Sequence, residues 1–390
     1  MKNNGKLSNS FNRCLPLPAS SFVLFGPRGT GKTRWLRDTL PHAHFIDLLS
    51  EAAYHDYLAY PGRFAEELSS LKRGTWVVVD EIQRLPNLLN EVHRLIEMRG
   101  LRFALCGSST RKLKQAGVNL LAGRLLRSAM HPFIPSELGA KFDLASALRF
   151  GLLPLVFSAK NKSETLAAYV RAYLAEEIKA EALVRNLAGF ARFLPIVALF
   201  HGQVMNISNI AAEAGVSRST VQGFIEILQD TLLCEPLPAY EAKLRVRERK
   251  HPKWYFADPG IVRALKNQLG PVAIEERGPL FEGMVFQTLR AYRDYRRIFD
   301  EMFYYASHSG KSFEVDFILR KGKRWIALEV KAGERWRPES LRGLSLLKQE
   351  MKIHKAYCIV PEGNSRLLAN GIEVISFARF AEGLEKNSLF

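Results

Sequence analysis

The sequence is poor in cysteine and contains no long apolar run. Its 390 residues include only four cysteines, and these are widely separated: Cys14, Cys106, Cys234 and Cys358. Because no C-x-x-C pair is present, they predict neither a zinc site nor a disulfide framework, and a reduced, cytoplasmic protein is the simplest interpretation. No stretch of about 18 uninterrupted apolar residues occurs, so we expect no transmembrane segment and no membrane partner. Residues 1–17 are polar and lack the apolar core of a secretory signal, which predicts a flexible N-terminal segment.

Acidic residues are also scarce relative to basic ones. The chain has 39 Asp and Glu against 56 Lys and Arg, which gives a net charge of +17. A charge of this sign favours a polyanionic partner, most often nucleic acid. A basic surface that only maintains solubility would have the same composition, so the position of the basic residues has to decide between the two.

A glycine-rich loop follows a short apolar segment near the start of the chain. Phe22–Phe25 predicts a buried strand, residues 34–40 predict a helix, and a G-x-x-x-x-G-K-T pattern lies between them. Glycines let successive backbone N–H groups point at one anion, and the N-terminus of the following helix adds positive potential. In this context the pattern predicts a phosphate cradle for ATP rather than a chance glycine-rich turn. The predicted cofactor-binding residues are Gly26, Pro27, Arg28, Gly29, Thr30, Gly31, Lys32 and Thr33.

Two adjacent carboxylates follow a second apolar segment. The run Trp76–Val79 predicts a central parallel strand, and Asp80 and Glu81 come directly after it. A strand that ends in a solvated acidic turn would look the same, but here the phosphate-loop pattern precedes it. We expect Thr33 and Asp80 to hold ATP-bound Mg²⁺. Lys32 would contact the β- and γ-phosphates, and Glu81 would polarise the attacking water.

Residues 18–140 alternate between predicted strands and helices. Such alternation predicts a parallel sheet whose ligands lie at the C-terminal ends of the strands. Ser108 lies at the end of the strand expected at residues 101–109, where it would orient the attacking water or only stabilise a turn. Arg124 would either reach the phosphate of a neighbouring subunit or remain a solvated surface residue, and Arg127 is a second candidate for that role.

Several of these motifs together resemble a known family. The segments similar to the AAA-type ATPases of bacteria and archaea are residues 26–33, 77–86, 106–109, 122–124 and 130–138. More narrowly, they resemble the group whose C-terminal domain is of unknown function and related to restriction endonucleases. The resemblance implies a P-loop AAA-type parallel sheet with helices on both faces, and ATP and Mg²⁺ as cofactors. It also implies a homo-oligomer, such as a hexameric ring, in which an arginine acts in trans.

The middle of the chain contains the clearest pattern for nucleic-acid binding. Residues 141–195 predict helices that form either a lid or a connector. Farther on, residues 207–221 have helix-turn-helix spacing, with Gly215 at the turn and Ser217 at the N-cap position. With the strands expected around a basic segment, they resemble a winged-helix domain, used either for DNA or only for architecture and protein contact. The predicted DNA-binding residues are Arg218, Ser219 and Thr220 in a recognition helix, and Lys243, Arg245, Arg247, Arg249 and Lys250 in the wing.

A last group of charged residues is expected near the C-terminus. Glu282 lies on a predicted helix and Asp316 on a strand, while Glu329 and Lys331 lie two apart on another strand and so share a face. The pattern resembles the PD-(D/E)xK nuclease fold, with Val315 in place of the nominal proline. The resemblance implies that Asp316 and Glu329 bind a metal ion, with Glu282 and Lys331 in support. A domain that keeps the fold without cutting DNA is the alternative.

These patterns predict an α/β protein of several parts. The expected order is a P-loop AAA-type core at 18–140, helices at 141–195, a winged-helix domain at 196–272 and an α/β nuclease-like domain at 273–390. The expected function is a Mg²⁺-dependent ATPase that binds duplex or branched DNA and couples hydrolysis to moving or remodelling it, with the C-terminal domain used for DNA binding. The alternatives are an ATP-controlled, metal-dependent DNA nuclease and an ATP-binding switch that contacts a partner protein.

Overall fold

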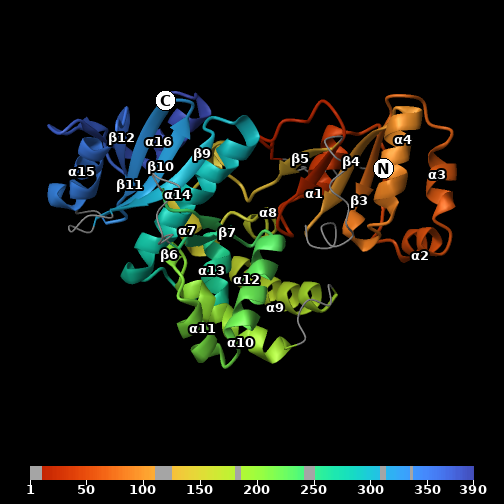
Figure 1. Cartoon of the computed structure of the whole chain (residues 1–390), viewed down its shortest axis with the longest axis horizontal. Helices are drawn as coiled ribbons and strands as arrows, with labels where there is room; N and C mark the ends of the chain where they lie inside the picture. The colour runs from red at the N-terminus through yellow and green to blue at the C-terminus, as the bar shows by residue number, and fades with distance from the viewer. Residues whose placement is uncertain (1–10, 110–124, 181–185, 241–250, 308–312, 334–336) are drawn as a thin grey trace, which may run out of the picture.

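The computed structural model describes residues 11–109, 125–180, 186–240, 251–307, 313–333 and 337–390. Within these ranges the chain forms three β-sheets with surrounding helices (Figure 1). The sheets follow one another along the sequence, with β1–β5 in the first, β6–β8 in the second and β9–β14 in the third. None of the described helices is both long enough and apolar enough to cross a membrane.

The first sheet is parallel throughout, with the strand order β2-β3-β4-β1-β5. Its strands are β1 (Phe22–Phe25), β2 (His44–Asp47), β3 (Trp76–Asp80), β4 (Arg102–Gly107) and β5 (Leu126–Ala129). The elements between them are α1 (Lys32–Thr39), α2 (Glu51–Ala59), α3 (Gly62–Leu68), α4 (Leu88–Arg99) and the 3₁₀ turn η1 (Ile82–Arg84). Because the strands all run the same way, their C-terminal ends meet at one edge. The predicted parallel α/β core is confirmed.

Alternate residues of the central strands pack into two different cores. Val77 and Val79 of β3 belong to one apolar cluster, and Val78 belongs to another. In β4, Leu105 and Cys106 divide between the same two clusters. Successive side chains of a strand point to opposite faces, so an uninterrupted apolar run means that both faces of the sheet are covered.

The middle of the chain is mostly helical and contains the small second sheet. Its helical elements are α6 (Pro135–Leu138), η3 (Gly139–Lys141), α7 (Leu144–Phe150), α8 (Pro154–Phe157), α9 (Lys162–Ala180), α10 (Leu187–Leu199), α11 (Ile207–Ala214), α12 (Arg218–Asp230) and α13 (Pro259–Leu265). The antiparallel strands β6 (Gln203–Val204), β7 (Cys234–Leu237) and β8 (Lys253–Phe256) pair in the order β6-β8-β7.

Helices α11 and α12 lie where the sequence predicts a helix–turn–helix pair. Gly215 ends α11 with a φ of 63°, a left-handed conformation that glycine adopts without steric cost. Ser217 Oγ then accepts a 3.2 Å hydrogen bond from the backbone N–H of Thr220 and caps α12. Ile210 and Val221 are fully buried in the core that the two helices share. These two residues and the capped turn fix the orientation of α12 relative to α11.

The third sheet is mixed and follows a long helix. Its elements are α14 (Ile274–Arg296), β9 (Glu301–Ala306), β10 (Glu314–Lys321), β11 (Arg324–Val330), η4 (Pro338–Leu341), α15 (Arg342–Glu350), β12 (Lys355–Val360), β13 (Arg366–Leu367), β14 (Ile372–Ser376) and α16 (Phe377–Glu385). The strand order is β13-β14-β12-β11-β10-β9. Strands β11, β12 and β14 are parallel neighbours, whereas β9 and β10 pair antiparallel.

Helix α14 connects the third sheet to the rest of the molecule (Figure 1). It contacts β5, α7 and β8 as well as β11 and α16. Phe281 and Val285 of α14 belong to one continuous apolar core together with Leu24 of β1 and Phe317 of β10. The first and third sheets are therefore joined through buried side chains rather than through a solvated linker.

The N-terminal segment packs against this core from residue 11 onward. Leu15 is buried, and the guanidinium of Arg13 donates hydrogen bonds to Thr30, Glu137 and Tyr295. Residues 11–15 of the segment expected to be flexible are therefore held by partners far along the chain. Residues 1–10, Arg124 and the five wing residues between 243 and 250 lie outside the described ranges.

Candidate functional site

The glycine-rich loop connects the end of β1 to the start of α1. Gly29 and Gly31 have φ values of 78° and 86°, which other residues adopt only with strain. At Gly26, an added Cβ would lie 2.3 Å from the carbonyl oxygen of Met130, so only glycine fits between the loop and the chain after β5. The start of α1 has no side-chain cap, so its first N–H groups are not satisfied by a capping side chain, as the predicted anion site requires.

Lys32 and Thr33 are the first two residues of α1. The buried ammonium of Lys32 donates hydrogen bonds to the carbonyl oxygens of Gly26 at 2.7 Å and Pro27 at 3.2 Å, so it lies over the loop. Thr33 Oγ1 donates a 2.7 Å hydrogen bond to Asp80 Oδ2 at the end of β3. The predicted residues of the loop and of the acidic strand are thus brought together. A hydroxyl and a carboxylate side by side are oxygen ligands that Mg²⁺ prefers, so these two residues fit the predicted ion.

Glu81 adopts a left-handed backbone conformation with φ of 56°, which is rare for a residue with a long side chain. This conformation turns the chain sharply after β3. Burial raises the pKa of its carboxyl group, and the Asp80 charge adds to this, while the Lys32 ammonium acts in the opposite direction. A carboxylate with a raised pKa beside a cation is suited to accept a proton near neutral pH.

Gln83 connects two of the predicted catalytic residues. Its Nε2 donates hydrogen bonds to Glu81 Oε2 and, at 3.3 Å, to Ser108 Oγ at the end of β4. Its Oε1 is buried and has no partner among the described atoms. Sequence reasoning missed Gln83. The signal that could have identified it is its position two residues after Glu81. A tight turn at the end of a strand can direct the side chain two residues later back toward that strand end.

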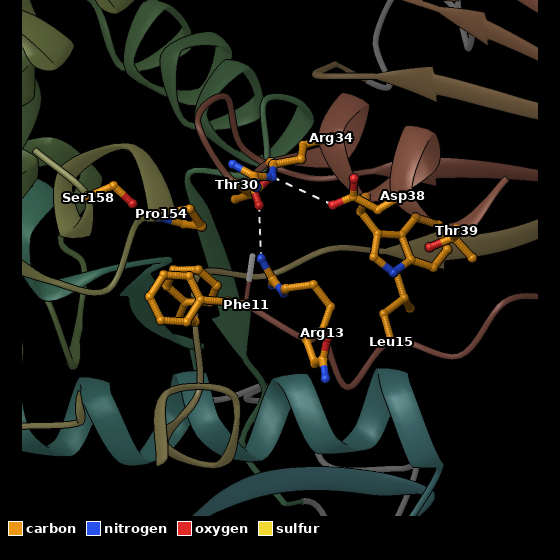
Figure 2. Close-up of a pocket in the computed structure, with 13 residues that line it drawn as sticks. Phe11, Arg13, Leu15, Thr30, Arg34, Asp38, Thr39, Pro154 and Ser158 are labelled. Atoms are coloured by element: carbon orange, nitrogen blue, oxygen red, sulfur yellow. Dashed lines mark hydrogen bonds and ion pairs between the residues drawn. The ribbon is translucent and has the colours of Figure 1, made fainter. Parts of the chain in front are cut away.

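A cavity of about 520 Å³ lies beside the loop (Figure 2). Residues of the loop and α1, including Thr30 and Trp35, line one part of it, and Phe11 and Arg13 of the N-terminal segment line another. Arg13 Nη1 donates a 2.9 Å hydrogen bond to the Thr30 carbonyl, which fixes the segment against the loop. The volume is within the usual range for small-molecule sites. Sequence reasoning missed this contribution, because nothing in the local pattern links the segment to the loop.

The predicted charged residues of the C-terminal part also lie close together. A register shift in β10 between Val315 and Ile318 displaces Asp316, whose Oδ2 accepts a 2.8 Å hydrogen bond from the backbone N–H of Val330 in β11. Lys331 Nζ donates a 2.6 Å hydrogen bond to Glu329 Oε1. The bulge therefore brings Asp316 to the end of β11, next to the E-x-K residues.

A lysine that the sequence did not indicate lies among these acids. Lys253 Nζ of β8 is 3.3 Å from Glu282 Oε1, 2.5 Å from Glu314 Oε1 and 3.8 Å from Asp316 Oδ1. Tyr255, on the same face of β8, donates a 2.5 Å hydrogen bond to Glu282 Oε1. These contacts bring β8, in the middle of the chain, into the acidic group of the third sheet.

Burial dominates the electrostatics of this group. It raises the pKa of Glu282 to about 7 and that of Glu329 to about 8, in each case with a further contribution from the Asp316 charge. Burial disfavours the Lys253 ammonium, but Glu282, Asp316 and Glu314 hold its pKa above the ordinary value. Within the described residues, no three His, Cys, Asp or Glu side chains are grouped as metal ligands would be. The predicted metal-site acids are near one another, but the Lys253 ammonium lies within 3.8 Å of two of them, Glu282 and Asp316.

The start of α12 contains the described part of the predicted DNA-binding set. Arg218 and Ser219 are exposed, and Thr220 is partly exposed. The hydroxyls of Ser219 and Thr220 share hydrogen bonds with Ser217 Oγ at 2.9 and 2.8 Å. The first turn of α12 is therefore an ordered, solvent-accessible surface with a positive group at its N-terminal end.

Three protein families match successive parts of the chain. Residues 19–139 match an AAA domain family, residues 141–271 match a domain of unknown function (DUF8612), and residues 277–380 match another domain of unknown function (DUF4143). Uncharacterized proteins of Mycobacterium bovis and Mycobacterium tuberculosis are each 26% identical over 280 residues, which is 69% of this chain and 62% of theirs. The chain therefore matches less than two thirds of the length of these relatives.

Solved structures show only distant likeness. ORC1 of Aeropyrum pernix, in complex with DNA, is 16% identical with a TM-score of 0.26, and the match covers 65% of this chain and 87% of that protein. A Vibrio cholerae protein (10% identity, TM-score 0.23) matches 95% of this chain and 97% of its own length. Can2 of Sulfobacillus thermosulfidooxidans, in complex with cyclic tetra-adenylate, matches 95% of this chain and 100% of its own length at 10% identity and a TM-score of 0.26.

TM-scores this low assign neither fold nor function. The AAA family match, the parallel sheet and the geometry of the loop agree with one another without them. Residues 19–139 form an AAA-type P-loop domain.

Proposed function

We propose that this protein is a Mg²⁺-dependent ATPase that binds DNA and uses hydrolysis to move or remodel it. The 2.7 Å hydrogen bond between Thr33 Oγ1 and Asp80 Oδ2, beneath a glycine loop that also holds Lys32, is the observation on which the ATPase part depends. Loop, lysine and hydroxyl come from one segment of the sequence and the carboxylate from another, and they meet at one edge of the sheet. This is the set of groups that phosphoryl transfer needs for positioning and charge stabilisation.

The loop and α1 would bind the triphosphate. Backbone N–H groups of the loop and the N-terminus of α1 are the anion donors. In this structure the Lys32 ammonium donates its hydrogen bonds to carbonyl oxygens of the loop. A phosphate oxygen offers a negatively charged acceptor in the same place, so Lys32 would exchange those neutral contacts for a charge-assisted one. Thr33 and Asp80 would hold Mg²⁺, which neutralises charge on the phosphates when bound.

The nucleoside would occupy the cavity beside the loop. Thr30 and Gly31 belong both to the loop and to the cavity wall, so a molecule bound by its phosphates would extend into it. Phe11 and Phe133 provide aromatic surface, and their rings lie 4.9 Å apart. In Figure 2 the side chain of Arg13 points toward Thr30 from the opposite wall, so the N-terminal segment closes one side of the cavity.

Glu81, Gln83 and Ser108 would act on the attacking water. Glu81 would take the proton as the water attacks the γ-phosphorus, and its raised pKa suits that step near neutral pH. Gln83 fixes the Glu81 carboxylate through a hydrogen bond and links it to Ser108. Arg124 of a neighbouring copy would then stabilise the transition-state charge in a homo-oligomer such as a hexameric ring.

DNA binding would use the helix–turn–helix pair and the basic segment after β7. The net charge of +17 favours a polyanion, and α12 begins with exposed Arg218 at a capped turn. In a winged-helix arrangement α12 would enter a groove, while Lys243, Arg245, Arg247, Arg249 and Lys250 would contact phosphates. A winged helix that contacts only protein is the alternative, and the salt dependence of DNA binding distinguishes the two.

An ATP-controlled nuclease is a second candidate because Glu282, Asp316, Glu329 and Lys331 converge in one place. Cleavage of linear, single-stranded and branched DNA by the wild-type protein in Mg²⁺ or Mn²⁺, abolished in Glu329→Ala and Lys331→Ala, would establish it. If wild type does not cut, the third sheet is a DNA-binding or protein-binding module.

The experiment that tests the main proposal compares ATPase rates with and without linear, single-stranded and junction DNA. We expect wild-type turnover to rise with DNA and with assembly in ATP, measured by particle size. Turnover that is unaffected by every DNA would favour a switch that contacts a partner protein. Turnover equal to wild type in both Lys32→Ala and Glu81→Gln would overturn the ATPase assignment.

A further inference from the structure

Strand β8 directs two side chains into the acidic group of the third sheet. Lys253 and Tyr255 are two residues apart and so lie on the same face of β8. Lys253 is only 5% exposed, and its ammonium group lies within 3.8 Å of carboxylate oxygens on α14 and β10. Tyr255 binds one of the same oxygens at 2.5 Å. A buried lysine is rare without partners, and this one has three.

The partners of Lys253 include the residues that a divalent ion would use. Glu282 and Asp316 are two of the three predicted metal-site acids, and Glu314 completes the surroundings of the ammonium group. A divalent ion needs oxygens on several sides within about 2.0–2.6 Å. An ammonium group in the middle of those oxygens fills that volume, and its charge repels a second cation in the low-dielectric interior.

The third predicted ligand, Glu329, is paired with a different lysine. Glu329 Oε1 is paired with Lys331 at 2.6 Å, and Oε2 is buried without a partner among the described residues. One oxygen of this carboxylate is therefore buried without a cation of its own. Removal of the Lys253 ammonium would leave this oxygen together with those of Glu282 and Asp316 and would convert a lysine site into an all-oxygen site.

We propose that Lys253 takes the place of a divalent cation in the acidic group of the third sheet, so that this part of the protein binds no metal ion of its own. The lysine supplies one positive charge to the three carboxylates around it and at the same time fastens β8 to α14 and β10. A strand from the middle of the chain thereby completes the C-terminal part. The proposal is independent of the ATPase, because none of these residues contributes to the phosphate loop.

Mn²⁺ titration in the absence of nucleotide tests the proposal. Bound and free Mn²⁺ are counted by electron paramagnetic resonance in full-length protein that carries Asp80→Asn, which removes the carboxylate at the phosphate loop. With Lys253 intact we expect no ion bound at the acidic group. With Lys253→Met added we expect one ion per chain, and this ion should be released again when Asp316→Asn is added. Lys266→Met is the matched control, because Lys266 is also a shielded lysine in an ion pair, with Glu276 at 3.1 Å, and its removal should add no ion.

Two results would overturn the proposal. One is Mn²⁺ bound by the Asp80→Asn protein with Lys253 in place and released by Asp316→Asn. The other is a folded Lys253→Met protein, with unchanged circular dichroism, that gains no ion. If Lys253→Met does not fold, the Asp80→Asn protein is compared with and without Asp316→Asn. Bound Mn²⁺ that depends on Asp316 contradicts the proposal, and the absence of such Mn²⁺ supports it.

Discussion

Arg13 Nη1 donates a 2.9 Å hydrogen bond to the carbonyl oxygen of Thr30 in the phosphate loop. The same guanidinium donates to Glu137 Oε1 at 3.0 Å and to Tyr295 Oη at 3.2 Å. Tyr295 belongs to α14, the helix that also contains Glu282. One buried side chain therefore contacts both the loop and α14, the helix that joins the first sheet to the third. A change in the loop conformation on nucleotide binding would therefore alter a contact of α14.

The first prediction concerns the buried pair of Arg13 and Glu137. Arg13→Met should lower the free energy of unfolding by about 3 kcal/mol, because it leaves the Glu137 carboxylate buried without its cation. Arg13→Met together with Glu137→Gln should recover much of that loss. Urea denaturation measures both. Arg34→Ala is the control, since Arg34 and Asp38 form an exposed pair that contributes at most about 1 kcal/mol. An Arg13→Met loss no larger than the control would contradict the prediction.

The second prediction separates nucleotide binding from hydrolysis. Lys32→Ala should weaken ATP binding and lower turnover by about a hundredfold or more, because in the proposed site the ammonium would contact phosphate in both the bound and the transition state. Glu81→Gln should lower turnover to a similar extent while ATP still binds, because the amide cannot accept the proton of the attacking water. Fluorescent-nucleotide titration and phosphate release measure the two effects. Glu81→Gln with full turnover would remove Glu81 from the catalytic role.

The third prediction assigns Gln83 a positioning role. Its Nε2–H stabilises the ionised Glu81 carboxylate and acts against the pKa increase caused by burial. Gln83→Met should therefore raise the Glu81 pKa further and move the acidic limb of the turnover–pH profile to higher pH. ATP affinity should stay unchanged, since Gln83 contacts no loop residue in the hydrogen bonds described here. A lower rate with an unshifted profile would indicate a merely structural effect.

The parts of the site that the sequence predicted are those with local patterns. The loop, Lys32 and Asp80 each follow a strand whose apolar run is unbroken, and a parallel sheet brings such strand ends together without further information. Arg13 and Lys253 could not be predicted in the same way. Their partners, Glu137 and Glu282, lie 124 and 29 residues farther along the chain, and only tertiary packing brings each pair together. Neither the period of a strand nor that of a helix encodes such a contact.

The fourth prediction concerns His201, which is fully buried in contact with α14. Its Nδ1 accepts a hydrogen bond from the backbone N–H of Phe256, Nε2 has no partner among the described atoms, and burial with the nearby Lys266 charge lowers its pKa to about 3. The unfolded chain takes up this proton near pH 6.5, so it binds more protons than the folded state between about pH 6.5 and 3, and stability falls as pH falls. Between about pH 6.5 and 4.5 the loss should reach about 2 kcal/mol.

His201→Asn tests this assignment, because the asparagine oxygen keeps an acceptor for the Phe256 N–H without a group that titrates in this range. Thermal unfolding at several pH values should show a shallower decline for the variant than for wild type. Glu282 and Glu329 also titrate in or near this range, but they are present in both proteins, so the difference between the two curves isolates the histidine. If the stability of the two proteins falls in parallel as pH falls, His201 does not cause the loss of stability at acidic pH.

The fifth prediction tests whether the basic residues after β7 contact the phosphates of bound DNA. The logarithm of the binding constant should fall linearly with the logarithm of the salt concentration, because each neutralised phosphate releases counterions. Arg245→Ala with Arg247→Ala should reduce that slope by about one for each phosphate that the variant no longer neutralises. Arg379→Ala with Lys386→Ala is the charge-matched control on α16 and the residue after it, where both side chains are exposed and paired with Glu382. Equal slopes for the two double variants would mean that net charge alone attracts the DNA, whereas a smaller slope only for Arg245 and Arg247 would place the phosphates along the segment after β7.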